Sequence, residues 1–296
     1  MQKNWKKILL STPILLYVGL LFVDAIFFFV GPMPEVIRIG RELLLLMVLL
    51  LLLPFRSHIS LLKVKQVIPT LRRLFIVAIA TAIFFQLSTS LLSENFQTIV
   101  AKYKILDFLK SFVFNALTTV ALLLLMLILF GIVTNLLFYK SKKRTQRNFR
   151  LLAIALLVAI FSAVWVGPAT FRETIFFDEN LFGITSGILI LFMLVNAFRA
   201  SWIDYLNRKE KWIVFLLSPV VATIGFVIYS GTPSSFFPSY SVAWSAVISL
   251  IALFWCIYSA VCSFLLLLRL PTAGAFDERV RAIKSMQKFS QSISHY

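Results

Sequence analysis

The stretch that decides the fold is residues 111–138, SFVFNALTTVALLLLMLILFGIVTNLLF, a run without a single charge. A helix of about 20 apolar residues crosses the hydrocarbon core of a bilayer, because each residue advances the helix by about 1.5 Å. Inside lipid, every backbone N–H and C=O needs a partner within its own segment, which favours helices over open strands. The stretch therefore predicts a transmembrane α-helix.

The rest of the chain repeats this pattern. Of its 296 residues 60% are hydrophobic and 14% charged, with a mean hydropathy of +0.93, a composition that excludes a water-soluble globular domain. We predict an all-α, polytopic integral membrane helix bundle over residues 1–268, the first span being a retained anchor rather than a cleaved signal peptide. About eight spans are expected, at Ile8–Val30, Val36–Leu53, Leu74–Leu92, Ser111–Phe138, Leu151–Val166, Leu181–Phe198, Trp212–Ser230 and Ala243–Leu268.

Positive charge alternates along the chain with the predicted spans. Of the 29 Lys and Arg residues, 23 lie on one side, in segments 1–7, 56–73, 139–150, 199–211 and 269–296, and six lie on the other. With the acidic residues included, the first side carries +19 and the second −2. Because basic residues in short loops stay in the cytoplasm, we predict that both termini are cytoplasmic. We interpret the net charge of +17 as a preference for the membrane surface, and expect no nucleic-acid partner.

Three charged residues near the outer end of the first hairpin are the candidate site inside the membrane. Asp24 lies in the first span, and Arg38 and Arg41 enter the second span after the short turn GPMPE. A charge inside a bilayer is expensive and needs a partner, so we predict an intramembrane ion pair among these residues. The pair either locks the first hairpin or has a functional role.

Two further features allow more than one interpretation. The outer segment 230–241, SGTPSSFFPSYS, is either a re-entrant lid or an interfacial loop. The two cysteines, Cys256 and Cys262, both lie in the last span, and the chain contains no catalytic or metal-binding signature. We therefore expect no cofactor and no metal.

The segment after the last span, residues 269–296, predicts a cytoplasmic linker helix after a Pro and Gly break. Its apolar positions recur about every 3.5 residues, at Phe276, Val280, Ile283, Met286, Phe289 and Ile293. This spacing is that of a coiled coil, which makes Val280, Ile283 and Met286 the candidate seam of a homodimer. The alternative is a single amphipathic helix that lies on the anionic inner leaflet.

The same segment carries the one family resemblance in the chain. It consists of Leu270, Pro271, Thr272, Ala273, Gly274, Phe276 and Asp277, followed by Ser285, Gln287, Phe289, Ser290 and Gln291. This short run resembles the junction after the last membrane helix in some bacterial multi-pass signalling proteins. The resemblance implies that a cytoplasmic output domain follows there, namely a GAF domain, a histidine kinase core or a protein-serine phosphatase. It also implies that the chain lies in a bacterial inner membrane.

The final residues Ile293, Ser294 and His295 also resemble the phosphoacceptor box of histidine kinases, with Tyr296 where that family has an acidic residue. His295 is thus a candidate phosphoacceptor, and the alternative is a histidine in a fraying terminal turn.

Taken together, these patterns predict a sensory or signal-input module embedded in the bilayer. It would pass a change in helix packing to a dimeric cytoplasmic helix, in response to a stimulus that the sequence leaves open. The alternatives are a small permease and, third, a membrane enzyme whose site the sequence does not reveal.

Overall fold

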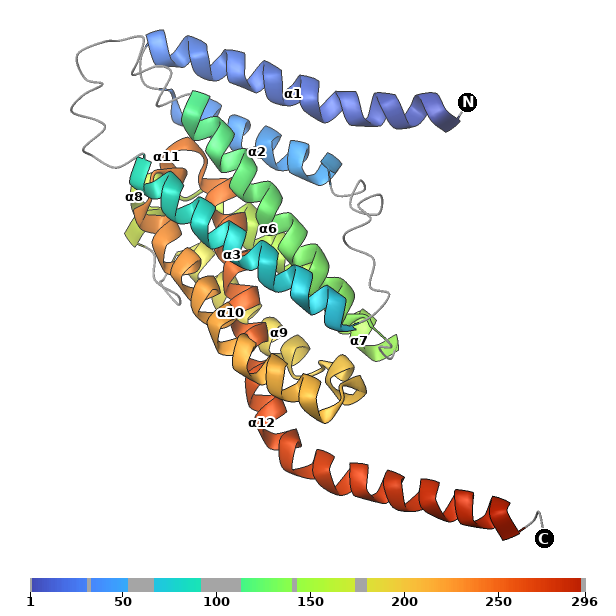
Figure 1. Cartoon of the computed structure of the whole chain (residues 1–296). Coiled ribbons are helices and arrows are strands. Elements are labelled where there is room, and N and C mark those ends of the chain that lie inside the picture. Colours follow the sequence, from blue (N-terminus) through green and yellow to red (C-terminus); the bar gives the residue numbers. More distant parts are fainter. Residues whose placement is uncertain are drawn as a thin grey trace.

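The computed structural model of the chain describes residues 2–30, 33–52, 67–91, 113–139, 143–173 and 180–293 (Figure 1). No strand occurs within these ranges. The elements are α1 (Gln2–Val30), α2 (Glu35–Leu52), α3 (Val67–Leu91), α6 (Asn115–Leu137), α7 (Lys143–Ala163), α8 (Pro168–Glu173), α9 (Leu181–Ala197), η4 (Ser201–Tyr205), α10 (Arg208–Ser234), α11 (Phe237–Tyr240) and α12 (Val242–Ile293).

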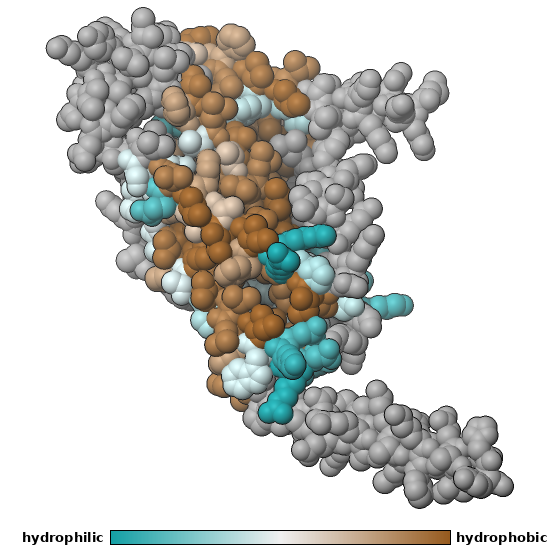
Figure 2. All heavy atoms as spheres, in the orientation of Figure 1, coloured by the Kyte–Doolittle hydropathy of each residue, from teal (hydrophilic) through white to brown (hydrophobic). Residues whose placement is uncertain are grey.

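Six helical segments of the described chain are long and apolar enough to cross a membrane. They are 67–90, 115–137, 143–163, 181–204, 208–234 and 242–268. On the face drawn in Figure 2, the coloured side chains of the bundle are mostly brown, that is apolar. These helices confirm the prediction of an all-helical, multi-pass membrane protein. The remaining two predicted spans correspond to α1 and α2, which lie beside each other at the edge of the bundle.

Helix α12 forms the centre of the bundle. It packs against α10 most extensively and also against α9, α6, α7, α2 and the short α11. From Val242 to Trp255 every residue is buried, and the segment is apolar on all its faces apart from small serines. A helix that is apolar all round belongs in the interior, and this position explains why the others gather around it.

Helices α3 and α10 lie at the periphery and bury only a narrow stripe. The buried positions of α3 step by three and four residues through Val67, Thr70, Leu74, Ala78, Thr81, Phe85 and Ser88. Those of α10 do the same through Val214, Ser218, Val221, Gly225, Ile228 and Thr232. This is the spacing of a coiled-coil seam, and it leaves the broad outward face of each helix to lipid.

Small side chains set the distance between α10 and α12. A Cβ atom on Gly225 would lie 3.0 Å from both the Ala252 carbonyl oxygen and the Cys256 backbone nitrogen. The two backbones are therefore in direct contact at this level. Helices in lipid gain stability from such close approach, because apolar burial gives no driving force between them.

Two features differ from the sequence-based expectations. The predicted Pro and Gly break after Leu268 is absent from the backbone, since α12 continues as a helix through Pro271 and Gly274 to Ile293. Figure 1 shows that the helix bends as it leaves the bundle, as expected where proline removes one hydrogen bond of the helix. The segment 230–241 is mostly helical, because α10 extends to Ser234 and α11 buries Phe237 and Tyr240.

Candidate functional site: a buried charged cluster at the start of α12

We call the two ends of the bundle the cap end, where α11 lies, and the tail end, where α12 leaves the bundle. At the cap end Asp24 of α1 and Arg41 of α2 form a bidentate ion pair. The Arg41 Nε donates to Oδ1 of Asp24, and Nη2 donates to Oδ2 at 2.7 Å. The Asp24 side chain is 9% exposed and that of Arg41 8%. The predicted pairing of these two residues is therefore observed in the structure, in the geometry that suits guanidinium and carboxylate best.

The third guanidinium nitrogen of Arg41 forms hydrogen bonds to groups other than Asp24. Its Nη1 donates to the Tyr240 carbonyl oxygen at 2.8 Å and to Oε1 of Glu42 at 3.1 Å. The guanidinium carbon also lies 5.0 Å from the centroid of the Tyr240 ring, a cation–π contact. All three nitrogens of the side chain therefore have acceptors, and one residue joins α1, α2 and α11.

Glu42 links α2 to the first turn of α12. Its Oε2 accepts a hydrogen bond from the Ser241 hydroxyl at 2.6 Å and from the Ala243 backbone N–H at 3.0 Å. Ser241 Oγ in turn accepts from the Trp244 backbone N–H at 3.2 Å, as an N-cap residue does. Two of the N–H groups that begin α12 are thus satisfied, one by Ser241 and one by a carboxylate from another helix.

The start of α12 offsets part of the negative charge of the cluster. Asp24, Arg41 and Glu42 sum to −1, and Glu42 is 2% exposed. The N-terminus of a helix carries the equivalent of roughly half a positive charge and stabilises an anion placed there. Glu42 lies at the N-terminus of α12, so the first turn of this helix stabilises its buried carboxylate.

Aromatic side chains enclose the polar groups. The Tyr17 and Tyr240 hydroxyls lie 3.0 Å apart, and the Tyr17 ring stacks on Trp244 with centroids at 5.6 Å. The Trp244 Nε1 donates to the Leu45 carbonyl oxygen of α2 at 3.2 Å. Burial raises the pKa of Tyr240, so its phenol stays protonated and remains available as a donor. The charged side chains of the cluster are therefore buried next to Tyr17, Tyr240 and Trp244.

The other predicted residues lie outside this cluster. Arg38 of α2 makes two contacts with other groups, both at 3.5 Å, to Glu35 and to the Val166 carbonyl oxygen. Val280, Ile283 and Met286 lie in the helical backbone of α12, beyond the bundle. His295 lies outside the described residues.

Sequence reasoning missed Glu42, Ser241 and Tyr240 as members of the site. A serine directly before a long apolar run is a signal for a helix N-cap, and Ser241 fits it. Glu42 gave no comparable signal, because its partners come about 200 positions later in the chain. Only the packing of α2 against the start of α12 brings them together.

Comparison of the chain with protein-family models, curated proteins and solved structures finds no match. The site is therefore interpreted from its own geometry. Among the described residues no group of three or more His, Cys, Asp and Glu side chains lies close enough to hold a metal ion. What the cluster does physically is to join α1, α2 and α11 to the first turn of α12.

Proposed function

We propose that this chain is the membrane-embedded input module of a bacterial signalling protein, located in the plasma membrane. It passes a change in helix packing along α12 to a cytoplasmic helix that pairs with a second copy of the chain. The observation that carries the proposal is the course of α12. One continuous helix begins in the charged cluster, runs through the centre of the bundle and leaves it to reach Ile293.

The contacts at the start of α12 suggest how a signal enters this helix. A change among α1, α2 and α11 reaches α12 directly, because Glu42 accepts hydrogen bonds from its first turn. A signal requires two arrangements of the bundle that bind the stimulus unequally. Displacement or rotation of α12 is the physical event that its tail would carry outward.

We further propose eight spans with both termini in the cytoplasm, α1 and α2 being the first two. Helix α1 exposes large apolar side chains every four residues, at Ile14, Val18, Phe22 and Ile26. Helix α2 likewise exposes Met47 and Leu50. Such faces are stable against lipid and unfavourable in water, which supports insertion of the hairpin.

Reporter fusions test this topology. Fusions at residues 65, 145, 205 and 285 should report the cytoplasm, and fusions at 100, 175 and 236 the opposite side, because the charge asymmetry of +19 against −2 orients every loop consistently. If residues 65 and 145 report opposite sides, the number of spans between them is wrong. Inversion of every reporter would overturn the orientation and with it the cytoplasmic tail.

Disulfide crosslinking tests the dimeric tail. In a background with Cys256 and Cys262 replaced, single cysteines at positions 280, 283 and 286 should crosslink between chains in native membranes. Cysteines at positions 281 and 284 are the matched controls and should give lower yields, because a seam repeats about every 3.5 residues. Uniformly low yields, with burial that weakens when anionic lipid is removed, would instead show a helix lying on the membrane surface.

The two alternative functions have no comparable support. A permease needs polar groups that converge on a cavity near the midplane. The cavity described below is lined mostly by apolar side chains. An enzyme needs a nucleophile or paired acid and base groups in reach of a substrate, whereas the carboxylates of the cluster are enclosed by their own partners.

A further inference from the structure

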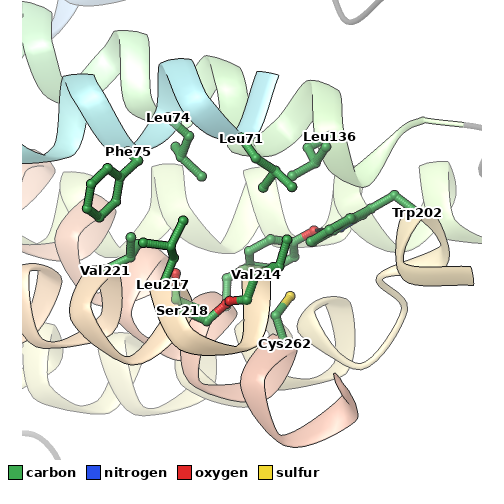
Figure 3. A pocket seen from close by; sticks show the side chains of 12 residues that line it. Leu71, Leu74, Phe75, Leu136, Trp202, Val214, Leu217, Ser218, Val221 and Cys262 are labelled. Carbon is green, nitrogen blue, oxygen red and sulfur yellow. Dashed lines mark hydrogen bonds between the residues drawn. The ribbon is translucent and has the colours of Figure 1, made fainter. Parts of the chain in front are cut away.

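A second feature lies toward the tail end, in the groove between α3 and α10. The two helices approach closely at the cap end, where a Cβ atom on Gly231 would lie 3.0 Å from the Phe85 ring. Closer to the tail end they enclose a cavity of about 40 Å³. Figure 3 shows Leu71, Leu74 and Phe75 on its α3 side and Val214, Leu217 and Val221 on its α10 side.

The lining of this cavity selects an apolar occupant. Trp202 and Tyr258 form its base, and the Trp202 Nε1 donates to the Tyr258 hydroxyl at 2.7 Å. The Ser218 hydroxyl donates to the Val214 carbonyl oxygen at 2.8 Å. The protein thereby satisfies the Trp202 N–H and the Ser218 hydroxyl, so a polar ligand would gain little from them, whereas the apolar side chains that make up most of the lining favour a hydrocarbon chain.

The mouth of the cavity faces the lipid phase. Leu71, Phe75 and Leu217 at its rim are partly exposed, while the residues behind them are buried. On either side of the rim, α3 exposes Ile76 and α10 exposes Leu216, both more than half exposed. A chain entering the cavity would therefore come from the bilayer itself.

Two arginines stand beside this mouth at an unusual depth. Helices α3 and α10 run parallel and touch at Phe85 and Gly231. Leu71 and Leu217 lie the same number of residues before this contact on their own helices. The next residues, Arg72 and Ser218, are therefore at the same level. Tryptophan side chains prefer the headgroup layer, and this level lies about 9 Å deeper along α10 than Trp212, counted at about 1.5 Å per residue. Arg72 and Arg73 are exposed, and among the described residues neither has an ion-pair partner.

We propose that the groove between α3 and α10 binds one anionic phospholipid, with the part of an acyl chain nearest the headgroup in the cavity and the phosphate on Arg72 and Arg73. Long arginine side chains reach from such a depth to the headgroup layer, and guanidinium binds phosphate through paired hydrogen bonds. The leaflet is the one at the tail end. Calling it the inner leaflet rests on the proposed topology, but the lipid site itself does not depend on a signalling role.

Lipid-dependent thermal unfolding tests the headgroup. The delipidated protein in mild detergent is titrated with phosphatidylglycerol or phosphatidylcholine carrying the same acyl chains. Phosphatidylglycerol should raise the unfolding temperature by several degrees more than phosphatidylcholine, because a ligand of the folded state stabilises it. Inorganic phosphate should give no rise, since it brings no chain to the cavity; an equal rise with phosphate would identify a free-anion site instead and overturn the proposal.

Matched variants locate the effect. Arg72→Gln with Arg73→Gln should abolish the difference between the two lipids. Arg147→Gln with Arg150→Gln removes the same charge from exposed positions on α7 and should leave the difference intact. If the lipids act equally on the unchanged protein, or if both double variants lose the difference alike, no specific site exists at α3 and α10.

Quenching of tryptophan fluorescence tests the chain. Phosphatidylglycerol brominated in the part of its acyl chain nearest the headgroup should quench the protein strongly, and Trp202→Phe should remove part of the quenched emission, because Trp202 lines the cavity. Trp212→Phe is the control, because Trp212 is exposed on α10 and does not line the cavity. It shows how much quenching is lost with a lipid-facing tryptophan alone. Quenching that is unchanged by Trp202→Phe would show that the chain stays outside the cavity. The arginine variants alter only exposed side chains, so they keep the test decisive if Trp202→Phe fails to fold.

Discussion

The two halves of α12 inside the bundle are held in different ways. The first half, Val242–Trp255, is buried at every position, and its first turn is tied by hydrogen bonds to α2. In the second half, which ends at Leu268, exposed positions recur at Ala260, Phe264 and Leu267, and a cavity lies beside Tyr258. Hydropathy alone does not distinguish the halves. The difference comes from what surrounds them.

This difference indicates where α12 can move. A segment that is enclosed on all sides and hydrogen-bonded at its start resists displacement, because each shift breaks contacts on several helices. The half toward the tail end has fewer neighbours, so a change in packing costs less there. A stimulus that loosens the cap end would therefore be expressed mainly at the tail end, which is the direction that the proposed function requires.

The largest effect is expected from Arg41→Gln, which removes the cation of the cluster. Asp24 and Glu42 would then be buried with no positive side chain, and such a loss costs about 3–5 kcal/mol. Unfolding temperature in detergent measures the effect. Asp24→Asn should also destabilise, but the double variant should lose less than the sum, because the two residues share one interaction.

Arg38→Gln is the matched control for that loss. Arg38 belongs to the same helix, but its side chain is 20% exposed and its two contacts are long, at 3.5 Å. Ion pairs of this kind contribute at most about 1 kcal/mol. Strict additivity of Asp24→Asn and Arg41→Gln, or equal losses for Arg38→Gln and Arg41→Gln, would contradict the role given to the cluster.

Much of the fold was predictable because the bilayer limits the choices. Runs such as residues 111–138 have no stable form in lipid other than a helix, so their positions follow from composition. A helix after Leu268 was predicted, but a break was expected before it, and α12 has none. Pro271 and Gly274 suggested a break, whereas a helix accepts one proline at the cost of a bend when the flanking residues favour it.

The candidate site was predictable only in part, for a related reason. Asp24 stood out because a carboxylate deep in an apolar run needs a partner, and Arg41 was the nearest cation at a similar depth. Glu42 and Ser241 meet only because α2 packs against the start of α12. The pairing of these helices depends on side-chain shape rather than hydropathy, and no pattern within either segment encodes it.

The close contact between α10 and the middle of α12 can be tested by adding one methyl group. Gly225 of α10 faces Ala252 and Cys256, and Gly225→Ala would place a methyl group 3.0 Å from their backbone atoms. Backbone cannot yield as the end of a side chain does, so α10 must move away from α12. Overpacking of this kind typically costs about 1–3 kcal/mol. A fall in the unfolding temperature, smaller than that of Arg41→Gln, is the expected result.

Gly40→Ala separates this steric effect from the general effect of adding a methyl group to a helix. Gly40 of α2 has no atom within 4 Å of an added Cβ, so its replacement should be neutral or stabilise by about 0.5–1 kcal/mol through backbone entropy. The two substitutions are chemically identical and differ only in their surroundings. If Gly225→Ala were as harmless as Gly40→Ala, the contact between α10 and α12 would be looser than the structure shows. The enclosed half of α12 would then not be held firmly against α10, contrary to the comparison of its two halves.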